Sequence, residues 1–227
     1  LAQNNRIHDN SDLGLYAAYG SGNIVRTNEI YNQASRGINF YAANTVFERN
    51  LVHHNGTGID GQYTSSFVGN AVYANTTGFN VYDVTLEGNR IYSNSVGVVD
   101  NGYSRIVNNV IYANTNQGVR VQGGHTVSDG DGLFNNTILQ LVGEGIRLTG
   151  TASNVVLVNN IVRVDAGYGV SVDANSQAGL VSDHNLLYRG PAANAFIGLW
   201  GGATQATLAA WQAASGKDAR SKSGNPL

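Results

Sequence analysis

The 227-residue sequence contains no cysteine, no methionine and only two prolines. The lack of cysteine excludes a disulfide scaffold and any thiolate metal site. Only two lysines are present, and 13 basic residues against 15 acidic ones give a formal net charge of −2. The chain therefore has no basic patch of the kind that binds nucleic acid, and we expect no nucleic-acid partner.

Long hydrophobic runs are also missing. No stretch approaches the roughly 20 consecutive apolar residues that a membrane-spanning helix needs, so we expect no membrane span. The first residues, Leu1 to Asn4, include no initiator methionine, basic segment or apolar leader. The absence of cysteine and methionine suits an oxidising environment. We therefore predict a mature or excised chain that is secreted or lies on the cell surface.

Glycine and asparagine are abundant, with 29 residues of each. Hydrophobic residues still make up 42% of the chain, which is more than a disordered low-complexity polymer contains and enough for a folded core. All-β folds of this length are often a single domain.

An internal repeat organises the sequence. Asparagine followed two positions later by an aliphatic residue recurs at spacings of 19 to 27 residues. The repeats begin at Asn5, Asn28, Asn50, Asn70, Asn89, Asn109, Asn136, Asn160 and Asn185. A second amide follows five positions later in the first six units, at Asn10, Gln33, Asn55, Asn75, Asn94 and Asn114.

Each unit then continues with glycine and an apolar residue, as in Gly118-Val119-Arg120-Val121. Such units contain short strands of period two, separated by turns that tolerate left-handed backbone. A unit this short cannot bury its apolar face alone, so neighbouring units must stack. We predict a β-solenoid of about nine coils in which equivalent asparagines hydrogen-bond along the axis as ladders.

The repeat resembles a known superfamily. Asn89-Arg90-Ile91-Tyr92-Ser93-Asn94 followed by Gly97-Val98, with its eight relatives over residues 3 to 190, looks like the repeats of right-handed parallel β-helix proteins. That superfamily includes pectate lyases, polygalacturonases, alginate lyases, mannuronan C5-epimerases, phage tailspikes and bacterial surface proteins. The resemblance implies an all-β, right-handed parallel β-helix, but not a particular function.

The repeat stops after Asn185, and a different pattern follows. Thr204 as N-cap, Leu208 and Trp211 on one face and Gly216 as the stop predict a short amphipathic helix that caps the last coil. This tail resembles those of secreted bacterial β-helix proteins. We expect a β-helix over residues 1–195 and a C-terminal cap over residues 196–227. No comparable helix precedes Asn5, so we expect the first coil to continue into further sequence or to pack on another chain.

The resemblance implies that a substrate would lie along one exterior sheet face, at the positions after each glycine-apolar pair. Two positions after glycine the sequence reads Tyr16, Asn39, Asp60, Asn80, Val99, Arg120, Arg147 and Ser171, and four positions after it Ala18, Tyr41, Gln62, Tyr82, Asn101, Gln122, Thr149 and Asp173. Tyrosine rings can stack on sugars and arginines can hold a uronate carboxylate. The predicted polysaccharide-binding residues are Tyr41, Asp60, Tyr82, Arg120 and Arg147. A solvated sheet face would show the same polar residues.

The catalytic motifs of the related enzymes are missing. Both lysines lie in the tail, and the proline, histidine and paired-aspartate motifs of lyases, C5-epimerases and polygalacturonases find no match. If the protein is an enzyme, the resemblance implies a polysaccharide lyase, a C5-epimerase or a glycoside hydrolase. The alternative is a structural or adhesive surface module within a larger protein or assembly.

Two further patterns could carry chemistry. His53-His54, with Asp60 on the same coil, could provide a base or a metal ligand, but His53 falls in a column of rings with His8 and Tyr31 that favours a stacking ladder. Asp129 and Asp131 alternate with glycine in the longest unit and could bind Ca²⁺, although the full twelve-residue calcium loop is absent.

Overall fold

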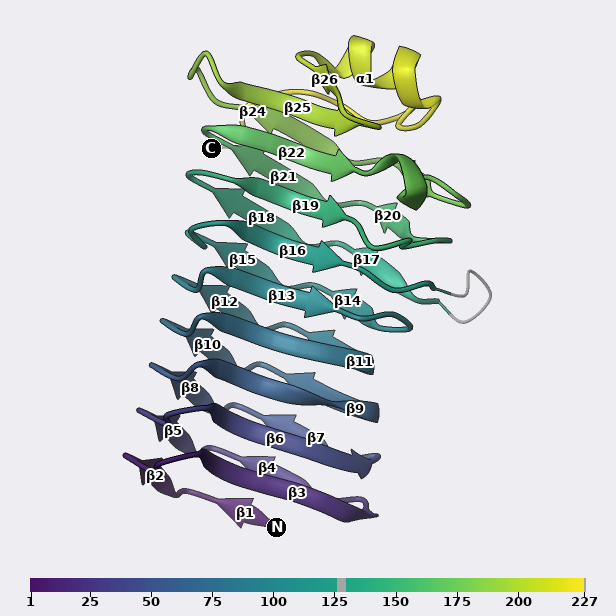
Figure 1. Ribbon diagram of the computed structural model, residues 1–227. Helices are drawn as coiled ribbons and strands as arrows, with labels where there is room; N and C mark the ends of the chain where they lie inside the picture. The colour runs from purple at the N-terminus through teal and green to yellow at the C-terminus, as the bar shows by residue number, and fades with distance from the viewer. Residues whose placement is uncertain (126–129, 227) are drawn as a thin grey trace.

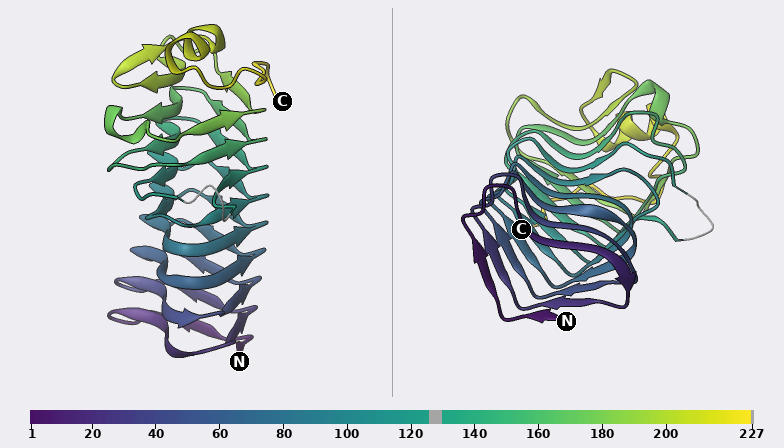
Figure 2. Two further views of the ribbon diagram at one scale, coloured as in Figure 1. Left: turned by 90° about the vertical axis from the view of Figure 1, so that its right-hand side faces the viewer. Right: turned by 60° about the horizontal axis from the view of Figure 1, so that its bottom comes forward.

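A computed structural model describes residues 1–125 and 130–226, and in it the chain winds into a stack of coils (Figure 1). Short parallel strands line three faces, and successive coils lie one above another along the whole rod (Figure 2). The predicted β-solenoid is confirmed. We call the three faces the narrow sheet, the broad face and the third face.

The narrow sheet consists of nine parallel strands, β2 (Arg6–His8), β5 (Glu29–Tyr31), β8 (Leu51–His53), β10 (Ala71–Tyr73), β12 (Arg90–Tyr92), β15 (Val110–Tyr112), β18 (Thr137–Gln140), β21 (Ile161–Val164) and β24 (Leu186–Arg189). Its strand order follows the chain order, so each coil adds one strand next to the previous one. This matches the expectation of about nine coils.

The broad face and the third face join into one sheet because β9 (Thr57–Val68) and β11 (Thr77–Glu87) run unbroken around the corner between them. The broad face adds β3 (Leu13–Ser21), β6 (Arg36–Ala43), β13 (Val96–Asp100), β16 (Gln117–Val121), β19 (Glu144–Leu148), β22 (Gly167–Val172) and β25 (Ala195–Trp200). The third face adds β1 (Ala2–Gln3), β4 (Ile24–Arg26), β7 (Val46–Glu48), β14 (Arg105–Val107), β17 (Gly132–Phe134), β20 (Val156–Val158) and β23 (Val181–Asp183). A 3₁₀ turn, Ala174–Ser176, follows β22.

The core is a column of aliphatic and aromatic side chains inside the coils. The aliphatic residue of every repeat from Ile30 onward is buried. Phe40, Phe47, Phe67 and Phe79 form an aromatic cluster near the N-terminal end, with ring centroids 4.5–5.5 Å apart. Because no coil encloses a core by itself, burial is complete only where a neighbouring coil covers it.

The corner into the narrow sheet is formed by one left-handed residue in each coil. The residue before each repeat asparagine has φ between 53° and 64°; these residues are Asn4, Thr27, Arg49, Gly69, Gly88, Asn108, Asn135, Asn159 and His184. A left-handed residue costs roughly 1–2 kcal/mol when it carries a Cβ. Thr27 and Arg49 adopt it all the same, so the corner is imposed by stacking and not by local preference alone.

The predicted asparagine ladder is confirmed. From Asn5 to Asn160, each repeat asparagine donates both its backbone N–H and its side-chain Nδ2 to the Oδ1 of the asparagine in the next coil, at 2.9–3.2 Å. From Asn28 onward these residues are buried. The ladder therefore gives a partner to a backbone donor that the corner would otherwise leave unpaired.

A second ladder follows the other end of the narrow sheet and is shorter. It runs from Asn10 through Gln33 to Asn114, whose N–H donates to Gln140 Oε1 at 3.0 Å. The next coil places Val164 beside Gln140. The buried Nε2 of Gln140 consequently has no partner among the residues that the structure describes.

The glycine at the second position of most broad-face strands is required by close approach. A Cβ on Gly58 would lie 2.7 Å from the carbonyl oxygen of Gly78 and 3.0 Å from Nδ2 of the ladder residue Asn75. The same contacts recur up the stack at Gly37, Gly78 and Gly97. Glycine thus lets successive coils pack at strand spacing while the second ladder passes beside them.

The aromatic column on the narrow sheet is also confirmed. The rings of His8, Tyr31, His53, Tyr73, Tyr92 and Tyr112 stack in that order with centroids 4.7–5.0 Å apart and interplanar angles of 7–17°. His53 is thereby held between two tyrosines, and its imidazole approaches Glu29 at 3.5 Å. Burial lowers the pKa of His53 below its ordinary value, against the opposing effect of the hydrogen bond with Glu29.

The C-terminal end is closed by β26 (Ala203–Gln205), which pairs antiparallel with β25, and by helix α1 (Leu208–Ser215). The helix ends at Gly216 with φ 67°, as expected. Its N-cap is Thr207, whose hydroxyl accepts from Ala210 N, so the prediction of Thr204 was wrong. Thr204 lies in β26 opposite Leu199, where strand pairing keeps it out of the helix.

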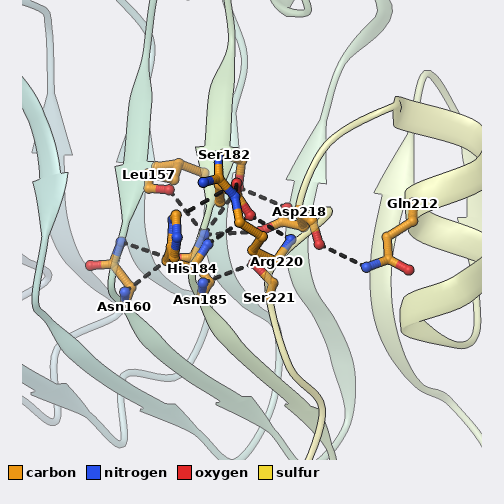
Figure 3. A network of polar contacts seen from close by, with 10 residues as sticks. Leu157, Asn160, Ser182, His184, Asn185, Gln212, Asp218, Arg220 and Ser221 are labelled. Carbon is orange, nitrogen blue, oxygen red and sulfur yellow. Dashed lines mark hydrogen bonds and ion pairs between the residues drawn. The ribbon is translucent and has the colours of Figure 1, made fainter.

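Asp218 ends the asparagine ladder (Figure 3). The last ladder residue, Asn185, donates its Nδ2 to Asp218 Oδ1 at 2.9 Å and its N–H to Ser221 Oγ at 2.8 Å. Asp218 also accepts from Ser182 Oγ and from Trp211 Nε1, each at 2.8 Å. A buried carboxylate and a hydroxyl thus take the place of the next coil's asparagine and tie helix α1 to the stack.

The expected division at residue 195 stays a prediction; the structure shows that parallel pairing continues through β25 to Trp200. The expected continuation beyond the first coil also stays a prediction. The described part of the chain has no helix with the length and hydropathy needed to cross a bilayer.

The first prediction concerns the ladder. We expect Asn109→Ala to lower the free energy of unfolding by about 2–6 kcal/mol, because the backbone N–H and the Nδ2 of Asn89 both lose Asn109 Oδ1 as their acceptor, at about 1–3 kcal/mol each. Urea unfolding followed by circular dichroism measures the change. Asn116→Ala, on an exposed asparagine, is the matched control and should change stability by less than about 0.5 kcal/mol. Equal losses in the two variants would contradict the ladder's role.

The second prediction concerns the cap. Both tryptophans of the chain, Trp200 and Trp211, meet there at 5.6 Å between ring centroids, so tryptophan fluorescence reports on the cap alone. We expect Asp218→Ala to shift the fluorescence transition to a lower temperature than the transition seen by circular dichroism. Four buried donors lose their acceptor in this variant, on Ser182, Asn185, Trp211 and Ser221. Lys217→Ala should leave the two transitions together. Coincident transitions in Asp218→Ala would show that the carboxylate does not hold the cap.

The third prediction concerns pH. A histidine whose pKa is lowered in the folded state contributes stability above its unfolded pKa of about 6.5 and loses it as the pH falls through the folded pKa. We expect His53→Tyr, which continues the tyrosine column, to gain stability relative to the natural protein between pH 7.5 and 5, by at most about 1.4 kcal/mol per pH unit. Chemical unfolding of both proteins at each pH measures the difference. A difference that does not vary with pH would contradict the prediction.

Candidate functional site

The strand register aligns the first polar column on the broad face as the repeat predicts. Position by position, Tyr16, Asn39, Asp60, Asn80, Val99, Arg120, Arg147 and Ser171 pair in successive strands. The columns are not uniformly exposed: Asn39, Val99 and Ser171 are buried. The accessible polar positions therefore gather on the middle coils.

Side chains on these middle coils form a continuous hydrogen-bonded chain along the rod. Arg36 Nε pairs with Asp60 Oδ2 at 2.5 Å, and Asn80 Nδ2 donates to Asp60 Oδ1 at 2.8 Å. Asn101 donates to Asn80 Oδ1 at 3.1 Å, and Gln122 donates to Asn101 Oδ1 at 2.7 Å. Five coils thus present one row of ordered amide and carboxylate groups, which differs from independently solvated side chains.

Two tyrosines border this row. Tyr41 and Tyr82, with Gln62 between them, line a shallow hollow of about 330 Å³ that also includes Asp60, Asn80 and Asn101. The structure therefore brings together three of the predicted binding residues, Tyr41, Asp60 and Tyr82. Rings beside ordered hydrogen-bonding groups can contact both the apolar face and the hydroxyls of a sugar.

A second hollow, of about 250 Å³, continues from Tyr82 around the corner toward the third face. It is lined by Asp83, Tyr103 and Asp131, and the rings of Tyr82 and Tyr103 meet edge to face at 5.5 Å. Asp83 and Tyr103 lie outside the two columns, so the repeat does not predict them as site residues. Their left-handed backbone, with φ of 55° and 57°, turns them out at the corner.

The two predicted arginines differ in their surroundings. Arg147 pairs with Glu144 Oε1 at 2.7 Å and with Asp173 Oδ1 at 2.8 Å. Burial alone would lower its pKa, but these two carboxylates outweigh that effect and raise the pKa above its ordinary value. Arg120 is on the preceding coil and makes no ion pair within the described residues, and its buried Nε has no hydrogen-bond partner there. Arg120 is therefore the cation that can accept an added anion.

The remaining candidates do not form a site with this row. His53 and His54 contact each other at 2.8 Å on the narrow sheet, whereas Asp60 lies on the broad face. Of the predicted Ca²⁺ ligands, Asp129 lies outside the described residues and Asp131 lines the second hollow. No group of three or more histidine, aspartate or glutamate residues suited to a metal occurs in residues 1–125 and 130–226.

One buried histidine–aspartate contact was not anticipated. His125 Nε2 lies 3.0 Å from Asp100 Oδ2, and both side chains are fully buried. Asp100 Oδ1 also accepts from Gly102 N at 2.9 Å. The pair takes an inward-facing position that other coils fill with apolar residues such as Val81 and Val121. It is closed to solvent, so it belongs to the packing of the coils and not to the broad-face row.

Three solved structures resemble the fold. The A-module of the mannuronan C-5 epimerase AlgE6 of Azotobacter vinelandii matches with a TM-score of 0.74 and 18% identity over 99% of this chain. The A-module of AlgE4 from the same organism matches with a TM-score of 0.50 and 16% identity over 84% of this chain and 71% of its own. The periplasmic alginate epimerase AlgG matches with a TM-score of 0.56 and 15% identity over 94% of this chain and 55% of its own.

The present chain spans 65% of the AlgE6 module's length. At these identities the likenesses establish the fold alone. No curated protein is similar enough in sequence to match. The family model described as "right handed beta helix region", however, matches residues 1–85 and 85–210, which is most of the chain. Together with the parallel coils and their asparagine ladders, this match shows that the chain belongs to the right-handed β-helix family.

Proposed function

We propose that the protein binds an extended acidic polysaccharide, such as a polyuronate, along the broad face. The observation that carries this proposal is the ordered polar row from Asp60 to Gln122, which lies beside the tyrosine hollow on the same coils. A linear sugar chain has hydroxyls at regular intervals, so a row of fixed amides along the rod provides matching donors and acceptors without further ordering cost.

Arg120 supports an acidic ligand. Its guanidinium is on the coil next to the paired Arg147 and has no carboxylate of its own within 4.0 Å in the described structure. A carboxylate from a uronate unit would supply the missing partner through a charge-assisted hydrogen bond. We assign to Arg120 the binding of this carboxylate. Arg147 is already held by Glu144 and Asp173, and we assign to it only the positioning of neighbouring side chains.

The similarity to alginate epimerases adds support for a polysaccharide ligand. Whether a reaction follows binding is a separate proposal, for which Tyr82, Asp83 and Tyr103 in the second hollow are the nearest proton-transferring groups.

The proposed polysaccharide ligand implies that the protein lies outside the cell, secreted or on the cell surface, where such polymers occur. Ca²⁺ binding at Asp129 and Asp131 stays a prediction.

The fourth prediction tests binding. In affinity electrophoresis and calorimetry with mannuronan, polygalacturonate and neutral dextran, we expect retention by the acidic polymers only. Arg120→Gln should weaken binding by about 10-fold or more, as expected for loss of a charge-assisted hydrogen bond. Tyr82→Ala should weaken it several-fold through lost ring stacking. Arg90→Gln, which removes the same charge from the narrow sheet, is the matched control and should bind like the natural protein.

The same samples are tested for reaction, by absorbance of unsaturated uronates and by NMR of the C5 configuration. If no polymer binds, or if Arg90→Gln loses as much affinity as Arg120→Gln, the proposed face is wrong. The chain would then be better explained as a structural or adhesive module. A rod with asparagine ladders and a C-terminal cap is enough for such a role.

A further inference from the structure

The aromatic stack on the narrow sheet stops at Tyr112, although the column itself continues. The register places Leu139, Arg163 and Tyr188 at the following three positions. One face of the Tyr112 ring is covered by Tyr92 at 4.9 Å. The opposite face meets a leucine, which is shorter than the tyrosines of the preceding coils.

A hollow of about 250 Å³ opens at this break. It is lined by Tyr112, Ala113, Leu139, Leu141, Arg163 and Asp165. It lies on the narrow sheet and shares no residue with the hollows of the broad face. The second ladder also ends on this coil, at Gln140, so two repeating columns break at the same level of the rod.

The spacing of the coils sets the width of this hollow. Rings on adjacent coils stack 4.7–5.0 Å apart here, and Tyr112 and Arg163 are two coils apart. A planar ring placed outside the tip of Leu139, midway between them, would lie at a normal stacking distance from the tyrosine ring and from the guanidinium plane. The break thus leaves space for one ring of the size that earlier coils supply themselves.

The charge of the hollow favours an uncharged ring. Arg163 Nε donates to Asp165 Oδ1 at 2.9 Å, and its Nη1 donates to Asn225 Oδ1 at 3.2 Å. Its guanidinium carbon lies 5.6 Å from the centroid of the Tyr188 ring. The charge of the arginine is therefore balanced by Asp165, and its guanidinium lies over the Tyr188 ring, so that it can stack on a further ring without needing an anion.

The exposed residues beside the hollow, which we call the rim, indicate what kind of molecule carries that ring. Leu141 and Val142 are 63% and 47% exposed beside the hollow, and a free ring small enough to enter it would leave them uncovered. A ring on a polypeptide would bring flanking residues over this rim. Interfaces commonly combine one aromatic anchor in a pocket with apolar contacts around it.

We propose that the hollow between Tyr112 and Arg163 binds an aromatic side chain of a polypeptide partner, which completes the interrupted aromatic stack and covers Leu141 and Val142. This site is separate from the broad face. It does not depend on the polysaccharide proposal, and either can fail alone.

The fifth prediction tests this site by two-dimensional amide NMR of the assigned protein. The probes are a Gly-Leu-Trp-Leu-Gly peptide, its alanine counterpart, and indole. We expect the tryptophan peptide to shift the amide signals of Tyr112, Leu139 and Arg163 with a millimolar or lower dissociation constant, several-fold tighter than indole, and the alanine peptide to have no effect. No shift with the tryptophan peptide, or equal affinity for free indole, overturns the proposal.

Leu139→Tyr would supply the missing ring from the chain itself. We expect it to abolish binding while the melting temperature stays at or above that of the natural protein, because each preceding coil carries a ring there. Leu51→Tyr, the same change at an exposed position of the narrow sheet, should bind normally. Retained binding in Leu139→Tyr, or a melting temperature lowered by more than a few degrees, counts against the vacant ring position.

A variant on the rim keeps the test independent of core packing. Val142→Ser changes an exposed side chain beside the hollow that does not line it and should leave folding intact. This variant should weaken binding of the tryptophan peptide several-fold and leave the affinity for indole unchanged. Equal weakening of both probes, or of neither, contradicts a polypeptide partner that covers the rim.

Discussion

The structure depends on how buried backbone N–H groups find partners at the corners of each coil. The corner before the narrow sheet is bent by a left-handed residue, and the following N–H donates to a side chain of the next coil instead of to a backbone carbonyl. The next coil's asparagine oxygen accepts both this N–H and the side-chain amide, from Asn5 through Asn160. Each coil therefore requires the one above it, both for hydrogen bonding and for burial of its apolar residues. This mutual requirement explains why Thr27 and Arg49 accept a left-handed backbone that neither prefers.

A ladder built this way needs a different partner at its end, because the last asparagine would leave two buried donors unpaired. Asp218 and Ser221 supply the missing acceptors to Asn185. The same carboxylate accepts from Trp211 on helix α1, so one residue both ends the ladder and fixes the helix to the stack. The cap is thus fixed mainly by polar contacts, whereas the amphipathic pattern of the sequence suggested apolar contacts alone. Trp211 provides both, because its ring is buried while its Nε1 donates.

The sequence alone was sufficient to predict the features that repeat from one coil to the next. The asparagine ladder, the ring column from His8 to Tyr112 and the register of Asp60 with Asn80 all follow from the period. Features that depend on side-chain reach were not predictable: the neutralisation of Arg147 by Glu144 and Asp173, the corner placement of Asp83, and the buried pair of His125 with Asp100. Thr204 and Thr207 were equivalent N-cap candidates by type, and only the pairing of β26 with β25 decides between them.

Departures from the period therefore carry more information about function than the repeat itself. When a residue matches its column, the stacking of the coils explains its identity, and no ligand is needed to account for it. Arg120 departs from its column because Val99 precedes it and its guanidinium has no carboxylate partner in the described structure, while Leu139 departs because every earlier coil from His8 onward places a ring there. Each departure leaves out a contact that a neighbouring coil has: the ion pairs of Arg147 in one case and the stacked ring of Tyr112 in the other. In both cases the missing contact has a definite chemistry, and a molecule that supplies it would bind to a surface already held rigid by the coils above and below.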